Sequence, residues 1–240
     1  MTGAASDIRR VETLFLDAGG VLVFPNWTRV ADALNAHGVR ADAAALTAAE
    51  PRAKQRLDFG ETIRSTDDQR RGWLYMDLVL AEAGVERSAA SDAALGSLRE
   101  YQATQNLWET VPDDVRPALE RLRAMGLRLV VVSNANGTLD KLFARLALDD
   151  HFDVLLDSHL EGVEKPDPRL FHIALERAGA RAESTVHVGD LYHVDVVGAR
   201  AAGLGAVLLD AASLYGSYDC PRVRNLPELA DLLTTWQALG

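Results

Sequence analysis

The chain has a single cysteine among its 240 residues, Cys220, which excludes a disulfide bond within the chain. A protein without disulfides fits a reducing compartment. The first ten residues contain no apolar segment typical of a leader peptide, and no apolar run is long enough to span a bilayer. From these absences we predict a cytoplasmic protein without a membrane partner.

Basic residues are in the minority, with 25 Lys and Arg against 35 Asp and Glu, and the formal net charge is -10. This balance argues against a nucleic-acid partner, and an anionic substrate would need a local cation or metal ion. The six histidines lack the spacing typical of a zinc site. The composition is otherwise that of an ordinary globular protein, and nothing in it predicts an oligomeric state.

The most informative stretch is TLFLDAGGVLV, at residues 13–23. Its apolar run at 14–16 is typical of a strand buried on both faces. Asp17 follows and enters a Gly-Gly turn, which permits a tight backbone and a close approach by a ligand. Open α/β sheets bind ligands at the carboxyl ends of their central strands, so Asp17 is a candidate site residue. Taken alone, however, this stretch favours an ordinary turn residue, and the functional interpretation depends on residues further along the chain.

A block of expected helices follows, without a strand pattern between them. We predict helices at 27–37, 41–57, 66–83 and 91–103, with a loop at 59–65. An all-helical insertion after the first strand is most simply a separate cap. We therefore predict a core domain made of 1–25 and 109–240 and a helical cap domain at 26–108.

Strands and helices then alternate. We predict strands at 127–132, 152–156, 185–188 and 206–209, and helices at 112–125, 138–148, 168–178, 194–202 and 226–239. This alternation implies a parallel sheet with helices on both faces. The predicted fold is α/β: a doubly wound, Rossmann-like parallel sheet with a helical cap inserted after its first strand.

Polar residues follow several of these strands or precede helices, namely Asp17, Ser133-Asn134, Lys165, and Gly189-Asp190 with Asp195. Taken singly, each could be a helix cap, an exposed lysine or a turn residue. Their joint occurrence favours a functional site. In chain order, the segments DAGGV, VVVSN, EKPDP and VGDLYHVD resemble the four motifs of the haloacid dehalogenase superfamily. The resemblance extends over nearly the whole chain, and the helical block occupies the place of that family's type-one cap.

The resemblance implies a phosphatase-like hydrolase that acts on a small phosphorylated substrate. Asp17 would be the nucleophile and would form an aspartyl-phosphate. Ser133 and Asn134, expected to begin a helix, would bind phosphoryl oxygens together with Gly20. Lys165 would neutralise the charge shared by the nucleophile and the phosphate.

The resemblance also implies Mg²⁺ as cofactor. Asp17, the backbone carbonyl of Gly19 and Asp190 would supply hard oxygen ligands, and water and substrate would complete the coordination. Asp195 would hold a metal-bound water or brace Lys165.

The sequence departs from the family's phosphatases two residues after the nucleophile, where they carry a second aspartate as general acid and base. This chain has Gly19 there, which keeps the carbonyl but lacks the proton donor. General acid catalysis typically contributes about 10²–10⁴-fold. We therefore expect a slow or specialised phosphatase, poor on alkyl phosphates and better on acyl or aryl phosphates. His193 is a candidate replacement for the acid.

Two other functions stay open. A phosphonatase- or dehalogenase-like enzyme would cleave a C–P or C–halogen bond without that acid. The former requires a cap lysine that forms a Schiff base, for which Lys54 is the candidate, whereas Asp190 argues against the metal-independent dehalogenase. The remaining interpretation is a catalytically weak protein that binds a phosphorylated ligand or a partner.

Overall fold

The structure is a computed structural model that describes residues 10–239. The chain divides into two compact units: Phe24–Thr110, here called the cap unit, and the rest of the chain, here called the core unit. Within the described range, no helix has both the length and the apolar character required to cross a membrane.

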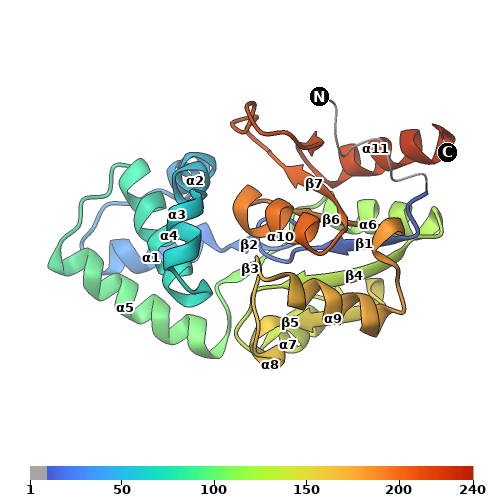
Figure 1. The fold of residues 1–240 in the computed structure, drawn as a ribbon. Helices are drawn as coiled ribbons and strands as arrows, with labels where there is room; N and C mark the ends of the chain where they lie inside the picture. The colour runs from blue at the N-terminus through green and yellow to red at the C-terminus, as the bar shows by residue number, and fades with distance from the viewer. Residues whose placement is uncertain (1–9, 240) are drawn as a thin grey trace. The chain divides into compact units, whose positions relative to one another are not determined.

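The core unit contains a six-stranded parallel sheet in the order β5-β4-β1-β6-β7-β8 (Figure 1). Its strands are β1 (Thr13–Leu16), β4 (Arg128–Ser133), β5 (Val154–Asp157), β6 (Thr185–Gly189), β7 (Gly205–Leu209) and β8 (Arg222–Val223). Numbered along the chain within this sheet, the order is 3-2-1-4-5-6, that of a doubly wound fold. The predicted fold class is therefore confirmed. The order in which strands are added to the sheet reverses between β1 and β6, and doubly wound sheets bind ligands at such a point.

Helices cover both faces of this sheet. They are α6 (Val115–Ala124), α7 (Leu139–Arg145), α8 (Ser158–Glu161), α9 (Pro168–Ala178), α10 (Val197–Ala201) and α11 (Leu226–Leu239), with short 3-10 helices η1 (Asp149–His151) and η2 (Ala182–Ser184). Phe15 and Val132 pack against residues of α9 and α10. Leu14 and Leu16 alternate with Phe15 along β1, so they point to the opposite face, and they are equally buried. On that face α6 and α11 contact each other (Figure 1).

Helix α9 has the predicted bounds because its ends carry strong local signals. The Asp167 side chain accepts a hydrogen bond from the Arg169 N–H, and Pro168 occupies the first helical position. Gly179 ends the helix in the left-handed conformation, with φ of 56°.

The helix predicted at 194–202 is only partly correct. A π-helical turn, η3 (Tyr192–Val196), comes first, and α10 begins at Val197. The turn starts earlier than the apolar pattern indicates because the Asp195 carboxylate accepts a hydrogen bond from the Leu191 N–H, at 3.0 Å. The helix predicted at 138–148 is also shorter, since Ala147 has φ of 51° and cannot continue a right-handed helix.

The cap unit consists of five helices and one short antiparallel strand pair (Figure 1). These are α1 (Trp27–Ala36), α2 (Ala43–Leu57), α3 (Gly60–Ser65), α4 (Asp68–Glu82), α5 (Ala89–Thr104), β2 (Phe24–Pro25) and β3 (Trp108–Thr110). The four predicted helices are present within a few residues of their expected ends. The loop predicted at 59–65 is wrong, because α3 occupies most of it. A six-residue helix that begins with glycine and lacks a side-chain cap has little helical signal in its sequence.

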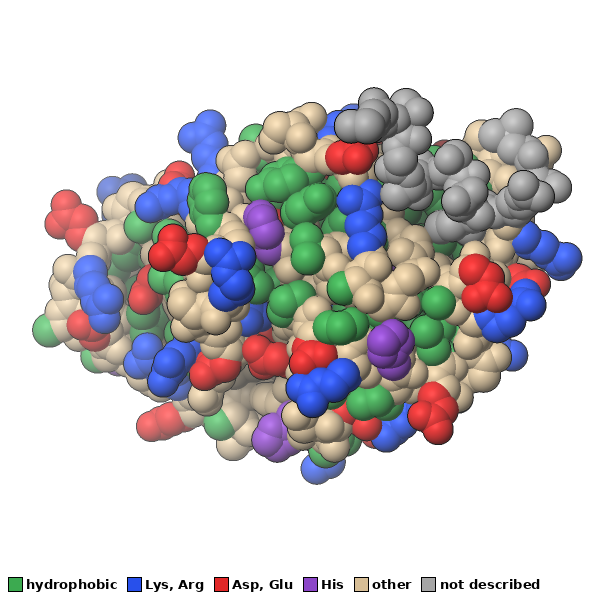
Figure 2. Space-filling model, in the orientation of Figure 1, with side chains coloured by type: hydrophobic (Ala, Val, Ile, Leu, Met, Phe, Trp, Pro, Cys, Tyr) green, Lys and Arg blue, Asp and Glu red, His purple; other side chains and the backbone are tan. Residues whose placement is uncertain are grey.

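Charged side chains of both signs are interspersed on the face of the molecule drawn in Figure 2. On this face the acidic side chains of the described residues do not gather into one patch (Figure 2). Within the core unit, Arg121–Asp231 and Arg177–Glu161 form ion pairs with contacts of 2.7 Å.

The close packing of α10 can be tested at Gly198. A Cβ atom there would lie 2.9 Å from the Phe171 ring and 3.0 Å from backbone atoms of Pro166, so the helix would have to shift. We expect Gly198→Ala to lower the free energy of unfolding by about 1–3 kcal/mol in urea denaturation. Gly216→Ala in the same unit is the matched control, since nothing lies within 4 Å of its added Cβ. Equal stability of the two variants would contradict this packing.

Candidate active site in the core unit

Three of the predicted site residues lie at one edge of the sheet. Asp17 directly follows β1, Ser133 ends β4, and Asp190 directly follows β6. Strand β1 lies between β4 and β6, and Leu16 is in register with residues near the ends of both neighbours. The carboxyl ends of parallel strands meet at the same edge, so the fold brings these three residues together.

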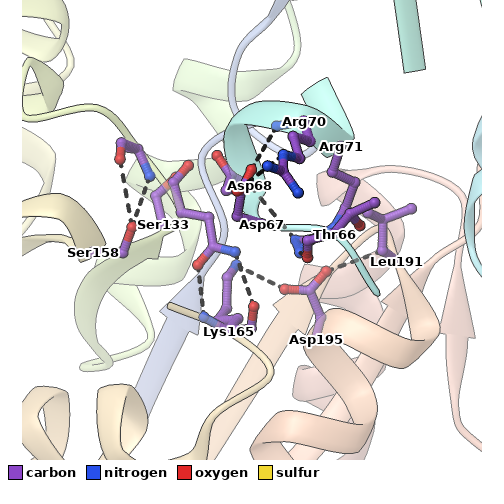
Figure 3. A network of polar contacts seen from close by, with 12 residues as sticks. Thr66, Asp67, Asp68, Arg70, Arg71, Ser133, Ser158, Lys165, Leu191 and Asp195 are labelled. Atoms are coloured by element: carbon purple, nitrogen blue, oxygen red, sulfur yellow. Dashed lines mark hydrogen bonds and ion pairs between the residues drawn. The ribbon is translucent and has the colours of Figure 1, made fainter. Parts of the chain in front are cut away.

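Lys165 connects this edge to the interior. Its side chain is 0% exposed, and its Nζ lies 2.9 Å from Asp17 Oδ1 and 2.8 Å from Asp195 Oδ1. Figure 3 shows its contact with Asp195. Burial by itself would lower the pKa of this amine, but the two carboxylates outweigh it and raise the pKa above its usual range. Lys165 is therefore an ammonium that joins the two carboxylates.

Asp195 is fully engaged by protein donors. Its Oδ1 accepts from Lys165 Nζ and lies 3.0 Å from His187 Nε2, and its Oδ2 accepts from the Leu191 N–H (Figure 3). Burial acts to raise the pKa of this carboxyl, but the Lys165 ammonium and the His187 hydrogen bond bring it well below its usual range. Of the two roles predicted for Asp195, this geometry favours bracing Lys165.

Gly189 makes this arrangement possible. A Cβ at this position would lie 2.0 Å from Asp195 Cγ, a distance no side chain tolerates. The glycine of the VGD segment is required for space, since the Asp195 carboxyl packs directly against the backbone at the end of β6.

Asp17, Asp190 and Asp195 form an acidic cluster whose potential ligand atoms lie within 4.8 Å of one another. Burial raises the pKa of Asp17 to about 7 against the opposing effect of Lys165, and the charges of Asp195 and Asp190 act in the same direction as burial. The Lys165 and Ala18 contacts both fall on Asp17 Oδ1. Crowded carboxylates with an available oxygen fit a hard divalent cation such as Mg²⁺, which would offset their mutual repulsion.

The turn after Asp17 determines which backbone groups are available. The N–H of Gly20 donates to the carbonyl of Val23 at 2.9 Å, and Gly20 has φ of 76°. The Gly20 amide is thus already paired within the turn, and the expected contact of Gly20 with a phosphate stays a prediction. Among the described residues, none is recorded as bonding to the N–H or the carbonyl of Gly19. That residue can supply both an amide to an anion and an oxygen to a cation.

The segment after Ser133 is a loop, and not the helix start that the sequence analysis expected. Helix α7 begins only at Leu139, because Asp157 holds the preceding residues in another conformation. The Asp157 Oδ2 accepts from the N–H of Gly137 at 2.9 Å and of Leu139 at 3.2 Å. The Ser158 Oγ accepts from the N–H of Ala135 at 3.1 Å (Figure 3).

Asn134 links this loop to Lys165. Its Nδ2 donates to the Lys165 carbonyl at 3.0 Å, and its Oδ1 accepts from the Lys165 N–H at 2.7 Å. The amide side chain is thus committed to protein contacts, so a phosphate contact from Asn134 would have to come from its backbone N–H. Neither Asp157, the last residue of β5, nor Ser158, which follows it, was predicted from the sequence, although polar residues also stand at the ends of β1, β4 and β6.

His193 lies in an aromatic cluster with Tyr192, Tyr215 and Tyr218. Tyr192 stacks on Tyr218 with ring centroids 4.1 Å apart, and the His193 ring meets both of these rings edge-on. Tyr215 contacts Tyr218 at 5.6 Å. The cluster ties η3 to the segment that follows β7. A proton-donating role for His193 stays a prediction.

In the cap unit, Lys54 is held by a carboxylate. Its Nζ lies 2.9 Å from Glu50 Oε1 and 5.4 Å from the centre of the Phe24 ring. Burial acts to raise the pKa of Glu50, but Lys54 and hydrogen bonds from neighbouring side chains lower it below its usual value. A carboxylate partner stabilises the ammonium form of Lys54, whereas a Schiff base needs the neutral amine. This pairing does not favour the phosphonatase interpretation.

Comparison with known proteins identifies the family of this chain. A family model described as haloacid dehalogenase-like hydrolase matches residues 11–203. The mouse haloacid dehalogenase-like hydrolase domain-containing protein 3 is 34% identical over 169 residues, which cover 68% of this chain and 66% of that protein. A glyceraldehyde 3-phosphate phosphatase from Methanopyrus kandleri is 32% identical, with 65% of each chain covered. The chain thus spans about two thirds of the length of these curated relatives.

Solved structures show the same fold. The hydrolase YfnB from Bacillus subtilis, in a structure described as bound to magnesium, superposes with a TM-score of 0.66 at 19% identity. The superposition covers 93% of this chain and 99% of that one. Because the family model extends over well more than half of the sequence, and the fold agrees with it, the protein belongs to the haloacid dehalogenase-like hydrolase family.

Proposed function

We propose that this protein is a Mg²⁺-dependent phosphatase that hydrolyses a small phosphorylated molecule through an aspartyl-phosphate on Asp17. The observation that carries the proposal is the buried Lys165 ammonium, which lies between Asp17 and Asp195 beside a further carboxylate, Asp190. The phosphatase among the relatives and the magnesium in the YfnB structure support it.

In this mechanism the Asp17 carboxylate attacks phosphorus, and the bond from phosphorus to the leaving oxygen breaks. Water then attacks the phosphorus of the aspartyl-phosphate, which releases phosphate and restores the carboxylate. Lys165 keeps Asp17 oriented and offsets the negative charge that the phosphoryl group brings to it.

The phosphoryl oxygens would be bound by the Gly19 N–H, the Asn134 N–H, the Ser133 hydroxyl and Lys165. Asp17, the Gly19 carbonyl and Asp190 would hold Mg²⁺, which when bound supplies charge neutralisation at the phosphoryl group. Asp157 and Ser158 keep the Ser133 loop in place, so the donors are positioned before the substrate arrives.

The leaving group receives no proton from position 19, because glycine has no donor. Substrates whose leaving oxygen is stable as an anion do not need one, and acyl and aryl phosphates are of this kind. We therefore propose that these classes are preferred over alkyl phosphates.

The nucleophile can be tested with 4-nitrophenyl phosphate and acetyl phosphate as substrates. We expect Mg²⁺-dependent turnover by the wild-type protein and a loss of roughly 10³-fold or more in Asp17→Asn, since the amide cannot attack phosphorus. Asp150→Asn is the matched control on the surface of the core unit. Full activity of Asp17→Asn would exclude the nucleophile, and a wild-type protein that binds phosphorylated ligands without turnover would favour a binding role.

The missing acid can be introduced at Gly19, whose φ is not positive, so a side chain there adds no left-handed backbone strain. We expect Gly19→Asp to raise kcat/KM on glycerol phosphate by up to about 10²–10⁴-fold, with little effect on 4-nitrophenyl phosphate. Gly19→Asn adds similar volume without a proton donor and should give no gain. An equal gain in both variants would show that proton donation is not the limitation.

Metal binding should depend on pH. In the metal-free protein burial raises the pKa of Asp17 to about 7, so below that pH Mg²⁺ must displace a proton from its ligand. We expect the affinity measured by titration calorimetry to fall by roughly tenfold per pH unit below this pKa and to level off above it. Asp17→Asn should bind more weakly and with no such dependence. A wild-type affinity that is constant across this range would contradict the assignment of Asp17 as a ligand.

A further inference from the structure

We propose that His187 is a positioning residue for the reaction, which acts through Asp195 to hold the Lys165 ammonium against the nucleophile. The inference deepens the proposed function and rests on it where it concerns the rate. None of the motifs that carry the family resemblance includes His187. Among the described residues, no hydrogen bond or ion pair joins His187 to Asp17 or to the groups proposed to bind the phosphoryl oxygens.

His187 lies in the interior of the core unit. Its side chain is 0% exposed, and its ring meets the Phe171 ring edge-on, with centroids 4.9 Å apart. Its Nε2 is 3.0 Å from Asp195 Oδ1. A carboxylate only accepts hydrogen bonds, so Nε2 carries the proton in this contact. The buried imidazole thus donates its Nε2 hydrogen bond to one specific oxygen, Asp195 Oδ1.

That oxygen is shared with Lys165. The distances from Asp195 Oδ1 are 3.0 Å to His187 Nε2 and 2.8 Å to Lys165 Nζ, and Lys165 Nζ is 2.9 Å from Asp17. The position of Oδ1 therefore sets the position of the ammonium. With His187 absent, Oδ1 would keep Lys165 as its single donor, and the carboxylate would be held only by Lys165 at Oδ1 and by the Leu191 N–H at Oδ2, so its orientation would be less tightly fixed.

The strand period explains why a histidine at this position reaches Asp195. Residues two apart on a strand face the same side, so His187 and Gly189 lie on one face of β6. Gly189 leaves the space in which the Asp195 carboxyl packs. His187 is the neighbouring side chain on that face, and it supplies the donor to the carboxyl that the glycine admits.

Burial lowers the pKa of His187, so the ring is neutral at ordinary pH. With Asp17 in its carboxylate form, the row of groups carries one negative charge on Asp17, one positive charge on Lys165 and one negative charge on Asp195. A neutral donor orients Asp195 without competing with Lys165 for its charge, which a lysine or arginine at this position would do.

The test compares His187→Gln, which keeps an N–H donor near the position of Nε2, with His187→Phe, which keeps the ring but has no donor. We expect His187→Phe to lower kcat on 4-nitrophenyl phosphate by about 10- to 100-fold with little change in KM, and His187→Gln to retain most of the rate. In a protein that already carries Asp195→Asn, adding His187→Phe should lower kcat little further, since both substitutions remove the same contact between residues 187 and 195. Thr185→Val, a buried isosteric change at the other end of β6, is the control.

A second readout does not need turnover. The chain has three lysines, Lys54, Lys141 and Lys165, so a protein labelled with ¹⁵N-lysine gives a side-chain spectrum that Lys54→Arg and Lys141→Arg assign. We expect a sharp, protected Lys165 ammonium signal in the wild type and in His187→Gln. The signal should broaden or disappear in His187→Phe. If that variant does not fold, His187→Asn, whose donor is too short to reach Asp195, takes its place.

The outcomes separate the two proposals. A wild type without turnover but with a Lys165 signal that depends on residue 187 would refute the phosphatase and support the positioning role. Turnover and a Lys165 signal that both persist in His187→Phe would overturn the role of His187. Equal loss of kcat in His187→Gln, or in Thr185→Val, would also overturn it, because the hydrogen bond would then not be the cause.

Discussion

The site depends on one buried positive charge. A lysine ammonium withdrawn from water is costly unless carboxylates surround it, and Lys165 meets this condition by lying between Asp17 and Asp195. These three residues come from separate parts of the chain, so the charge balance is complete only when the sheet has formed. Removing one carboxylate would leave an uncompensated charge in the interior. The same contacts that stabilise the fold here thus also fix the geometry of the candidate site.

Much of the fold follows from patterns that a single sequence contains. Strand β4 has four consecutive apolar residues and β1 has three, and α9 has a cap, a proline and a glycine in their expected places. The sequence did not predict β8, α3 or the π-helical turn. Strand β8 and helix α3 are too short to show a repeating pattern of apolar residues, and the π-helical turn depends on a side-chain contact of Asp195. Their existence is decided by tertiary packing.

The candidate site was predictable to the extent that its residues follow strands or belong to recognisable motifs. Asp17, Lys165, Asp190 and Asp195 were found in this way, and the structure brings them together. The sequence does not show which polar groups already form hydrogen bonds within the protein. The Gly20 amide and the Asn134 side chain do so, and only the folded structure reveals it. The two adjacent glycines therefore differ in role. The Gly20 N–H closes the turn, whereas the N–H and carbonyl of Gly19 stay available for a ligand.

The stacking of Tyr192 on Tyr218 has a consequence for the order in which the core unit is completed. Tyr192 belongs to the turn between Asp190 and Asp195, whereas Tyr218 lies in the segment between β7 and β8. The turn therefore receives this aromatic support only after β7 and the segment behind it have reached their places. The proposed cation site should accordingly gain its final rigidity late in folding, because one of its loops packs against a part of the chain that is synthesised after it.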